Sequence, residues 1–441
     1  MKRNATASPS FKALLPLGLF LAIFVGSGLY FQSLGTNFAF YQVAAPVAAL
    51  PAILLSILLA KEKLNETVER FLTGAGNSNI MAMCMIYLLA GGFSAVAKAT
   101  GGVDAVVQLA MVAIPSSFLL PGLFVVGALI STAMGTPMGT IAAIAPIALG
   151  IAGEASLPLP LTAGVITGGA IFGDNLSIIS DTTIAATRTQ GCEMKDKFRV
   201  NFMVACPAAL LTIIFLVFQA KGASVPKPQE ASLMLALPYA AILAMAVSGI
   251  NVFAVLFTGI LLAGIAGFAS AEGFTLLTFA KEIYSGFTGM QEIFILSIFI
   301  GGLGELMKAQ GGLKALERLV SGCIRTIASE KRGKTIAEAG IGVLVFLTNL
   351  CTANNTVSIL VTGGVVRNIA ETHAVEPKRA AGTLDIFSCI CQGMIPWGAQ
   401  LLLVGSIFEI SPIAVAGNVY YCMALLLCSL IAFFVQAPET K

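Results

Sequence analysis

The sequence GGFSAVAKATGG at residues 91–102 recurs 210 positions later as GGLGELMKAQGG at residues 301–312. Both glycine pairs and the lysine coincide in the two copies. Further along the chain, GTPMGT at 135–140 aligns with CTANNT at 351–356, so the second copy has gained a few residues in between. Internal repetition in a hydrophobic chain predicts two structural repeats, a plan typical of secondary transporters.

The composition places this repeat in a membrane. Hydrophobic residues make up 57% of the chain and charged residues only 11%, whereas soluble domains are about a quarter charged. Apolar runs of spanning length recur from Leu14 to Phe434, which predicts an all-α integral membrane protein surrounded by lipid bilayer. The net charge of +3 gives no indication of nucleic-acid binding.

The loop charges predict that the two repeats are inverted. Lys and Arg gather in the predicted loops 61–79, 185–199, 307–336 and 371–381. The predicted loops 31–40, 103–118, 154–160 and 403–417 contain none, while 220–231 and 269–284 hold three lysines between them. The positive-inside rule then places both termini in the cytoplasm of a multi-pass protein of the bacterial inner membrane. Loop 185–199 is cationic and its counterpart 403–417 is not, as inversion requires.

The chain therefore divides into a first inverted repeat at 1–219, a linker at 220–231 and a second inverted repeat at 232–441. Each repeat has two short apolar segments that meet at the aligned motif, which predicts re-entrant hairpins with tips at 135–140 and 351–356. Each also has an apolar run interrupted by polar residues, which predicts broken helices at 161–184 and 382–402. The short linker favours packing of the halves as one unit.

Polar clusters inside apolar segments are candidate sites, because lipid cannot satisfy them. In the first hairpin tip, Thr136 and Thr140 with freed carbonyls offer hard oxygen ligands for Na⁺, although the tip N–H groups could instead hold an anion. In the first broken helix, Asp174 and Asp181 would share a face if the helix were continuous, and either could bind Na⁺ or carry a proton. The alternative for Asp181 is a helix cap near Arg188. The remaining oxygen donors of this cation and proton site are Asn175, Ser177, Ser180 and Thr182.

The second half replaces acids with amides. Its hairpin tip supplies Thr352, Asn354, Asn355 and Thr356, and its broken helix supplies Asp385, Gln392, Trp397 and Gln400 as a substrate or second site. Alternatives remain for two of them: Asp385 could form a salt bridge near Arg379, and Trp397 could be an interfacial anchor. No cofactor motif, metal-ligand spacing or nucleophile–base pair occurs, so Na⁺ at Asp174 and Asp181 is the only expected metal and the chain is not expected to be an enzyme.

The stretch FGDNLSIISDTT at 172–183 resembles the signature of the NhaC-type Na⁺/H⁺ antiporter family, and the Ile-Pro-Trp sequence at 395–397 is also similar. The likeness covers about residues 80 to 430. It implies membership of the ion-transporter superfamily, whose members have inverted repeats, re-entrant hairpins, broken helices and an elevator-like cycle, and are often dimers. The chain departs from the family pattern at Ile178, where proline is common, and at Gly398, where asparagine often follows Pro-Trp.

Two functions follow from these patterns and the resemblance. The first is a Na⁺/H⁺ antiporter that exchanges cytoplasmic Na⁺ for H⁺ at the acids of the first half. The second is a Na⁺- or H⁺-coupled carrier of a small organic solute, an amino acid or carboxylate, which the amides of the second half would bind. Na⁺/H⁺ antiport is the primary prediction. The amide substitutions, together with relatives in the family that move organic solutes, support the carrier as the alternative.

Overall fold

The computed structural model describes residues 8–36, 39, 42–113, 115–177, 180–219, 232–270, 273–327 and 333–435. The predicted linker at 220–231 lies outside these residues. The described chain is all-α, and eight of its helices are long and apolar enough to cross a membrane. They become nine if α13 and α14, which meet at a 42° bend, form one span. The expected all-α membrane architecture is therefore confirmed.

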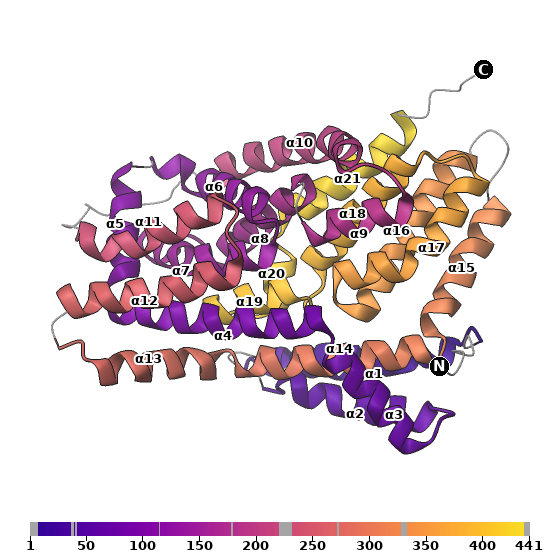
Figure 1. The fold of residues 1–441 in the computed structure, drawn as a ribbon, viewed down its shortest axis with the longest axis horizontal. Coiled ribbons are helices and arrows are strands. Elements are labelled where there is room, and N and C mark those ends of the chain that lie inside the picture. The colour runs from indigo at the N-terminus through magenta and orange to yellow at the C-terminus, as the bar shows by residue number, and fades with distance from the viewer. Residues whose placement is uncertain are drawn as a thin grey trace.

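Helices follow one another along the described chain, most of them after connections of a few residues (Figure 1). In the first half they are α1 (Leu15–Ser33), α2 (Ala45–Leu59), α3 (Leu64–Ala75), α4 (Ser78–Ala99), α5 (Gly102–Ala113), α6 (Leu119–Met134), α7 (Pro137–Glu154), α8 (Leu159–Leu176), α9 (Asp181–Gln190) and α10 (Met194–Gln219). In the second half they are α11 (Leu233–Val247), α12 (Val252–Ser270), α13 (Leu276–Gly289), α14 (Gln291–Ala309), α15 (Gly312–Ile327), α16 (Gly333–Thr352), α17 (Asn355–Thr372), α18 (Pro377–Met394), α19 (Ala399–Phe408), α20 (Pro412–Ala416) and α21 (Tyr420–Val435). Short 3₁₀ turns at Phe11–Leu14 and Ser116–Phe118 precede α1 and α6.

Several stretches predicted as loops contain helices. Helices α3, α5, α13 and α15 occupy most of 61–79, 103–118, 269–284 and 307–336, so the prediction of loops there was wrong. The same holds for 185–199, where α9 ends and α10 begins, and for 403–417, which contains the end of α19 and all of α20. The first four of these helices carry charged or polar side chains on one face and apolar ones on the other. A search for continuous apolar runs misses amphipathic helices such as α3 and α15, because their mean hydropathy is low.

The hairpins and helix breaks lie where polar and small residues interrupt the apolar runs. Helix α6 turns into α7 at Gly135, with φ 68°, and α16 turns into α17 at Ala353, with φ 48°. Thr136 and Asn354, which follow these turns, are both extended. The residue whose backbone matches Gly135 is thus Ala353, two positions beyond the Cys351 of the sequence alignment.

The first glycine pair of each copy, at 91–92 and at 301–302, lies where helices of the two halves cross. A Cβ atom on Gly91 of α4 would collide with the backbone of Gly286 on α13, and one on Gly74 of α3 would collide with the backbone of Gly301 on α14. The second glycine of each pair faces an aromatic ring, Phe287 beside Gly92 and Phe71 beside Gly302. Each of these Gly-Gly pairs therefore packs closely against an amphipathic helix of the other half.

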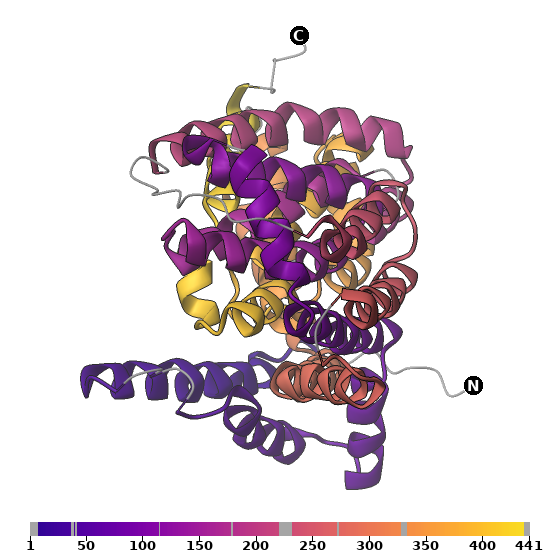
Figure 2. The ribbon, with the colours of Figure 1, turned by 90° about the vertical axis from the view of Figure 1, so that its left-hand side faces the viewer.

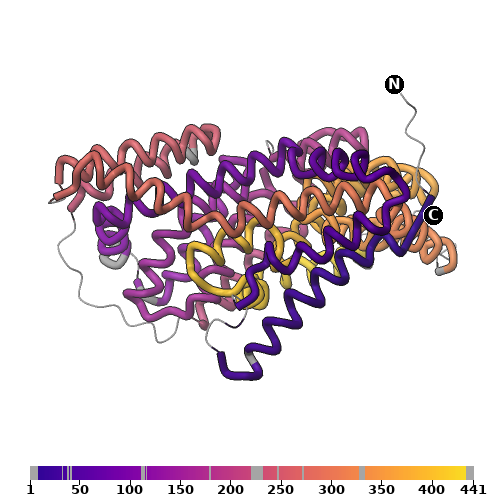
Figure 3. The backbone as a smooth tube through the Cα atoms, turned by 90° about the horizontal axis from the view of Figure 1, so that it is seen from below, coloured from indigo at the N-terminus to yellow at the C-terminus, as the bar shows by residue number. Residues whose placement is uncertain are grey.

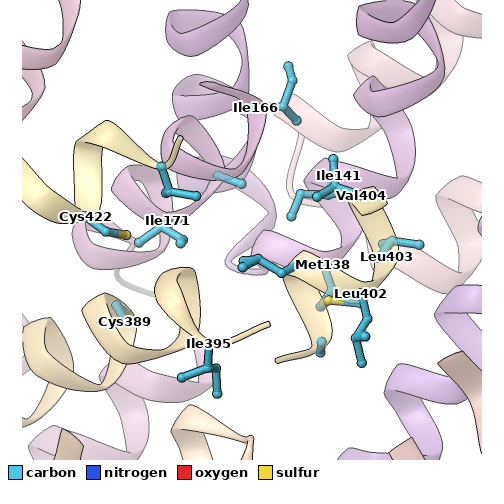
Figure 4. Packing of buried hydrophobic residues seen from close by; sticks show 14 of the residues in the cluster. Met138, Ile141, Ile166, Ile171, Cys389, Ile395, Leu402, Leu403, Val404 and Cys422 are labelled. Atoms are coloured by element: carbon cyan, nitrogen blue, oxygen red, sulfur yellow. The ribbon is translucent and has the colours of Figure 1, made fainter. Parts of the chain in front are cut away.

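These crossings form a lower layer of the molecule. Helices α4 and α13 run side by side in Figure 1, and Figure 2 shows α1 to α3 beneath the main body. Helices α13 and α14 follow one another across the face seen in Figure 3. One hydrophobic core continues from this layer into the main body and contains residues of both halves, such as Ile141, Ile171, Ile395 and Leu403 (Figure 4). This core surrounds the broken helices α8–α9 and α18–α19.

Candidate functional site

Helix ends from both halves surround a cavity of about 110 Å³. The starts of α7, α9 and α17 border it together with the ends of α8 and α18, and α4 closes one side. Its lining consists of Asn79, Ala82, Met83, Ile86, Gly135, Thr136, Pro137, Met138, Asp174, Ser180, Asp181, Thr182, Asn354, Asn355, Thr356, Gln392 and Gln400. None of these residues is basic.

The cavity brings together most of the residues predicted from the sequence. Those that line it are Thr136, Asp174, Ser180, Asp181, Thr182, Asn354, Asn355, Thr356, Gln392 and Gln400. Those outside the lining are Thr140, Asn175, Ser177, Thr352, Asp385 and Trp397. The Thr140 hydroxyl donates to the Thr136 carbonyl at 3.1 Å, and that of Thr352 donates to the Asn354 carbonyl at 3.2 Å. Both threonines thus stabilise hairpin tips.

Asp174 is the buried acid of the cavity. It lies in the last turn of α8 and is only 1% exposed. The Ser180 hydroxyl donates to its Oδ1 at 2.5 Å, and the Cys389 thiol donates to its Oδ2 at 3.4 Å. Both donors are neutral, and no described Lys, Arg or His lies within ion-pair distance of it. Since an isolated buried carboxylate is costly, this position favours binding of a cation or a proton.

Asp181 reaches the cavity from the other side of the helix break. Because α8 ends at Leu176 and α9 begins at Asp181, the two acids do not share a face of one continuous helix. Asp181 is exposed, and Ser180 rather than Asp181 caps α9, by accepting a hydrogen bond from the Thr182 amide. The Ser180 and Thr182 hydroxyls lie 2.7 Å apart, next to Asp174. Two carboxylates and two hydroxyls thus border one side of the cavity.

One known protein family matches almost the whole of this chain. The profile of the Na⁺/H⁺ antiporter family matches residues 7–221 and 229–436, nearly the whole chain. The chain belongs to the Na⁺/H⁺ antiporter family. The resemblance to NhaC-type proteins predicted from 172–183 is thereby confirmed, and in this family member that stretch forms the end of α8 and the start of α9.

The relatives of this antiporter-family chain are named for different transported solutes. The Na⁺/H⁺ antiporter NhaC of Bacillus subtilis is 26% identical over 65% of this chain and 69% of its own length. The malate-2H⁺/Na⁺-lactate antiporter of the same organism is 24% identical over 91% of this chain and 89% of its own. The arginine/ornithine antiporter ArcD of Halobacterium salinarum is 26% identical over 92% and 87%. Membership of the antiporter family thus covers both predicted functions.

The structure also reveals an ion pair of this antiporter-family chain that sequence reasoning missed. Lys197 was expected in a cytoplasmic loop at 185–199, but it lies in the first turn of α10 and is 1% exposed. Its ammonium lies 2.8 Å from Oδ2 of Asp385, which is fully buried on α18. Asp385 therefore pairs with Lys197, whereas Arg379 pairs with Glu338 at 2.6 Å. A lysine among other loop cations gives no sequence signal of burial.

Trp397 stabilises the second helix break from outside the cavity. Its indole N–H donates to the Leu350 carbonyl near the end of α16 at 3.1 Å, and Phe20 packs against its ring edge. The side chain is 8% exposed. Trp397 therefore connects the second helix break to the second hairpin.

Proposed function

We propose that this chain is a Na⁺/H⁺ antiporter in which Na⁺ and a proton compete for Asp174. The observation that carries the proposal is the uncompensated charge of this buried carboxylate, whose described hydrogen-bond donors are the neutral Ser180 and Cys389. A bound proton removes the charge, and a bound Na⁺ balances it, so only one of the two can occupy the site at a time.

The other groups at the cavity suit a hard monovalent cation. The hydroxyls of Ser180 and Thr182 and the carboxylate of Asp181 offer further oxygen ligands around Asp174. No basic side chain lines the cavity to repel a cation. The helix break supports this function as well, because broken helices inside the membrane form the ion sites of many transporters.

The test is proton movement in proteoliposomes that contain a pH-sensitive dye, after a pulse of Na⁺. We expect Asp174→Asn to abolish the Na⁺-dependent pH change. The matched control is Asp104→Asn, the same substitution at an exposed position of α5, which should retain exchange. Full exchange by Asp174→Asn would exclude the assignment.

A second candidate function is coupled transport of a small organic solute. The Oε1 atoms of Gln392 and Gln400 are buried at the cavity without a hydrogen-bond partner among the described residues. Such acceptors fit the ammonium group of an amino acid. The names of two relatives also include organic solutes, malate and lactate in one and arginine and ornithine in the other. Proton movement that requires added amino acids or carboxylates, and that is lost in Gln392→Leu, would favour this function over cation exchange alone.

We also propose that the chain works as two inverted repeats with both termini in the cytoplasm, in an elevator-like cycle and as a homodimer. Residues with positive φ support the repeat, since all those described except Gly273 occur at equivalent helix ends in both halves: Gly35 and Gly249, Gly101 and Gly311, Gly135 and Ala353, Ser156 and Ala374, and Gly191 and Glu409. A carboxyl-terminal fluorescent-protein fusion, which fluoresces only in the cytoplasm, tests the orientation. Native mass spectrometry tests the dimer.

A further inference from the structure

The ammonium of Lys197 lies among oxygen atoms from three helices. Oδ2 of Asp385 on α18 is 2.8 Å away, Oγ1 of Thr183 on α9 is 2.7 Å away, and the carbonyl oxygen of Asn175 on α8 is 3.2 Å away. Asn175, Thr183, Lys197 and Asp385 are all buried. We call the oxygen atoms of Asn175, Thr183 and Asp385 the oxygen cage.

The oxygen cage has the chemistry of a monovalent-cation site. It combines a carboxylate, a hydroxyl and a backbone carbonyl, the donor types that hard cations prefer. The Asn175 carbonyl belongs to the last turn of α8, where the helix dipole is negative, and unwound helix ends of this kind coordinate Na⁺ in other transporters.

Asn201 keeps the oxygen cage in place independently of the lysine. Its side-chain amide donates to the Asn175 carbonyl at 2.9 Å and to Oδ2 of Asp385 at 2.7 Å. Oδ1 of Asp385 and Oδ1 of Asn201 have no hydrogen-bond partner among the described residues. A cation smaller than the lysine head group would therefore find an ordered set of oxygens with two further acceptors nearby.

We propose that the oxygen cage is a second cation site, next to Asp174, which Lys197 fills with its own ammonium in place of Na⁺. Asn175 directly follows Asp174, so both sites share the end of α8. The tethered ammonium neutralises Asp385 and occupies the position that a mobile cation would otherwise take. The proposal does not require that Asp174 itself binds Na⁺.

An ordinary structural salt bridge between α10 and α18 would show the same distances. The two alternatives differ in one consequence: only a cation site gains affinity for Na⁺ when the lysine side chain is shortened. The experiment therefore compares thermal unfolding of the purified full-length chain in NaCl and in choline chloride at equal ionic strength.

The variants are made in an Asp174→Asn background, so that Na⁺ binding at the first site cannot contribute. We expect Asp174→Asn alone to have the same Tm in both salts. Adding Lys197→Ala should create a Tm that is a few degrees higher in NaCl, since a ligand that binds only the folded state stabilises it. Adding Asp385→Asn as a third change should abolish the difference, because the oxygen cage then lacks its charge.

An equal Tm in both salts for a monodisperse Lys197→Ala variant would overturn the proposal. Lys197→Ser, which keeps a small polar group, is the second variant if the alanine variant aggregates. Aggregation in choline that Na⁺ prevents would support the proposal, whereas aggregation of both variants in both salts would overturn it, because Na⁺ should refill the oxygen cage. Failure of the Na⁺/H⁺ antiport proposal appears separately, as retained exchange in Asp174→Asn with Lys197 intact.

Discussion

Replacing Gly91 by alanine tests whether the repeated glycine pairs hold the two halves together. A Cβ atom at Gly91 would overlap the carbonyl oxygen of Gly286, its nearest neighbour, and would lie 2.6 Å from Cγ of Met290, where ordinary contacts are 3.4–4 Å. The Met290 side chain can rotate away, but the backbone of Gly286 belongs to a helix and cannot move alone. Helices α4 and α13 would have to separate by roughly 1 Å to restore normal contact.

The expected loss combines two opposing effects. Alanine favours a helix over glycine by about 1 kcal/mol, while overpacking against a rigid neighbour costs about 2–3 kcal/mol. Gly91→Ala should thus be destabilised by about 1–2 kcal/mol. The control Gly364→Ala in α17, where an added Cβ meets nothing within 4 Å, should be stabilised by up to about 1 kcal/mol.

The assay is thermal unfolding of both variants in the same detergent, followed by size-exclusion chromatography. The double variant Gly91→Ala/Gly286→Ala should lose less than the two single losses together, because each Cβ meets the backbone of the other helix and one separation relieves both. A Gly91→Ala variant as stable as Gly364→Ala would refute the close crossing.

Three further predictions concern the hairpin tip and the buried polar contacts. Ala353→Gly should raise stability by about 1 kcal/mol, because Ala353 has φ 48°, a left-handed conformation that disfavours side chains, and the thermal midpoint of unfolding measures it. Arg379→Met should cost about 3–5 kcal/mol because it leaves Glu338 buried without its cation, and a normal midpoint would contradict the pairing. Trp397→Phe should cost about 1–3 kcal/mol by leaving the Leu350 carbonyl without its donor, while the Na⁺ concentration dependence of exchange stays unchanged. A large shift in that dependence would instead assign Trp397 to the cation site.

Many helices and helix ends of this chain were predictable from its sequence, because they depend on residues that are neighbours along the chain. Long apolar runs require helices in a membrane, and polar or small residues inside them mark where helices end. Asp174, Ser180, Asn354 and Gln392 were recognisable for this reason, because each interrupts an apolar segment. The helix breaks near Leu176 and Met394 follow from the same residues.

Contacts between distant segments were not predictable in the same way. Lys197 was assigned to a loop because its neighbours in sequence are charged, yet Asp385, 188 positions away, and the end of α8 bury it. Tertiary packing also placed Trp397 outside the cavity. The sequence alone determined that the chain is helical and apolar and where the helices around the cavity break, since those properties depend on neighbouring residues. Only the tertiary structure decided which charges are neutralised, because that depends on which helix ends meet.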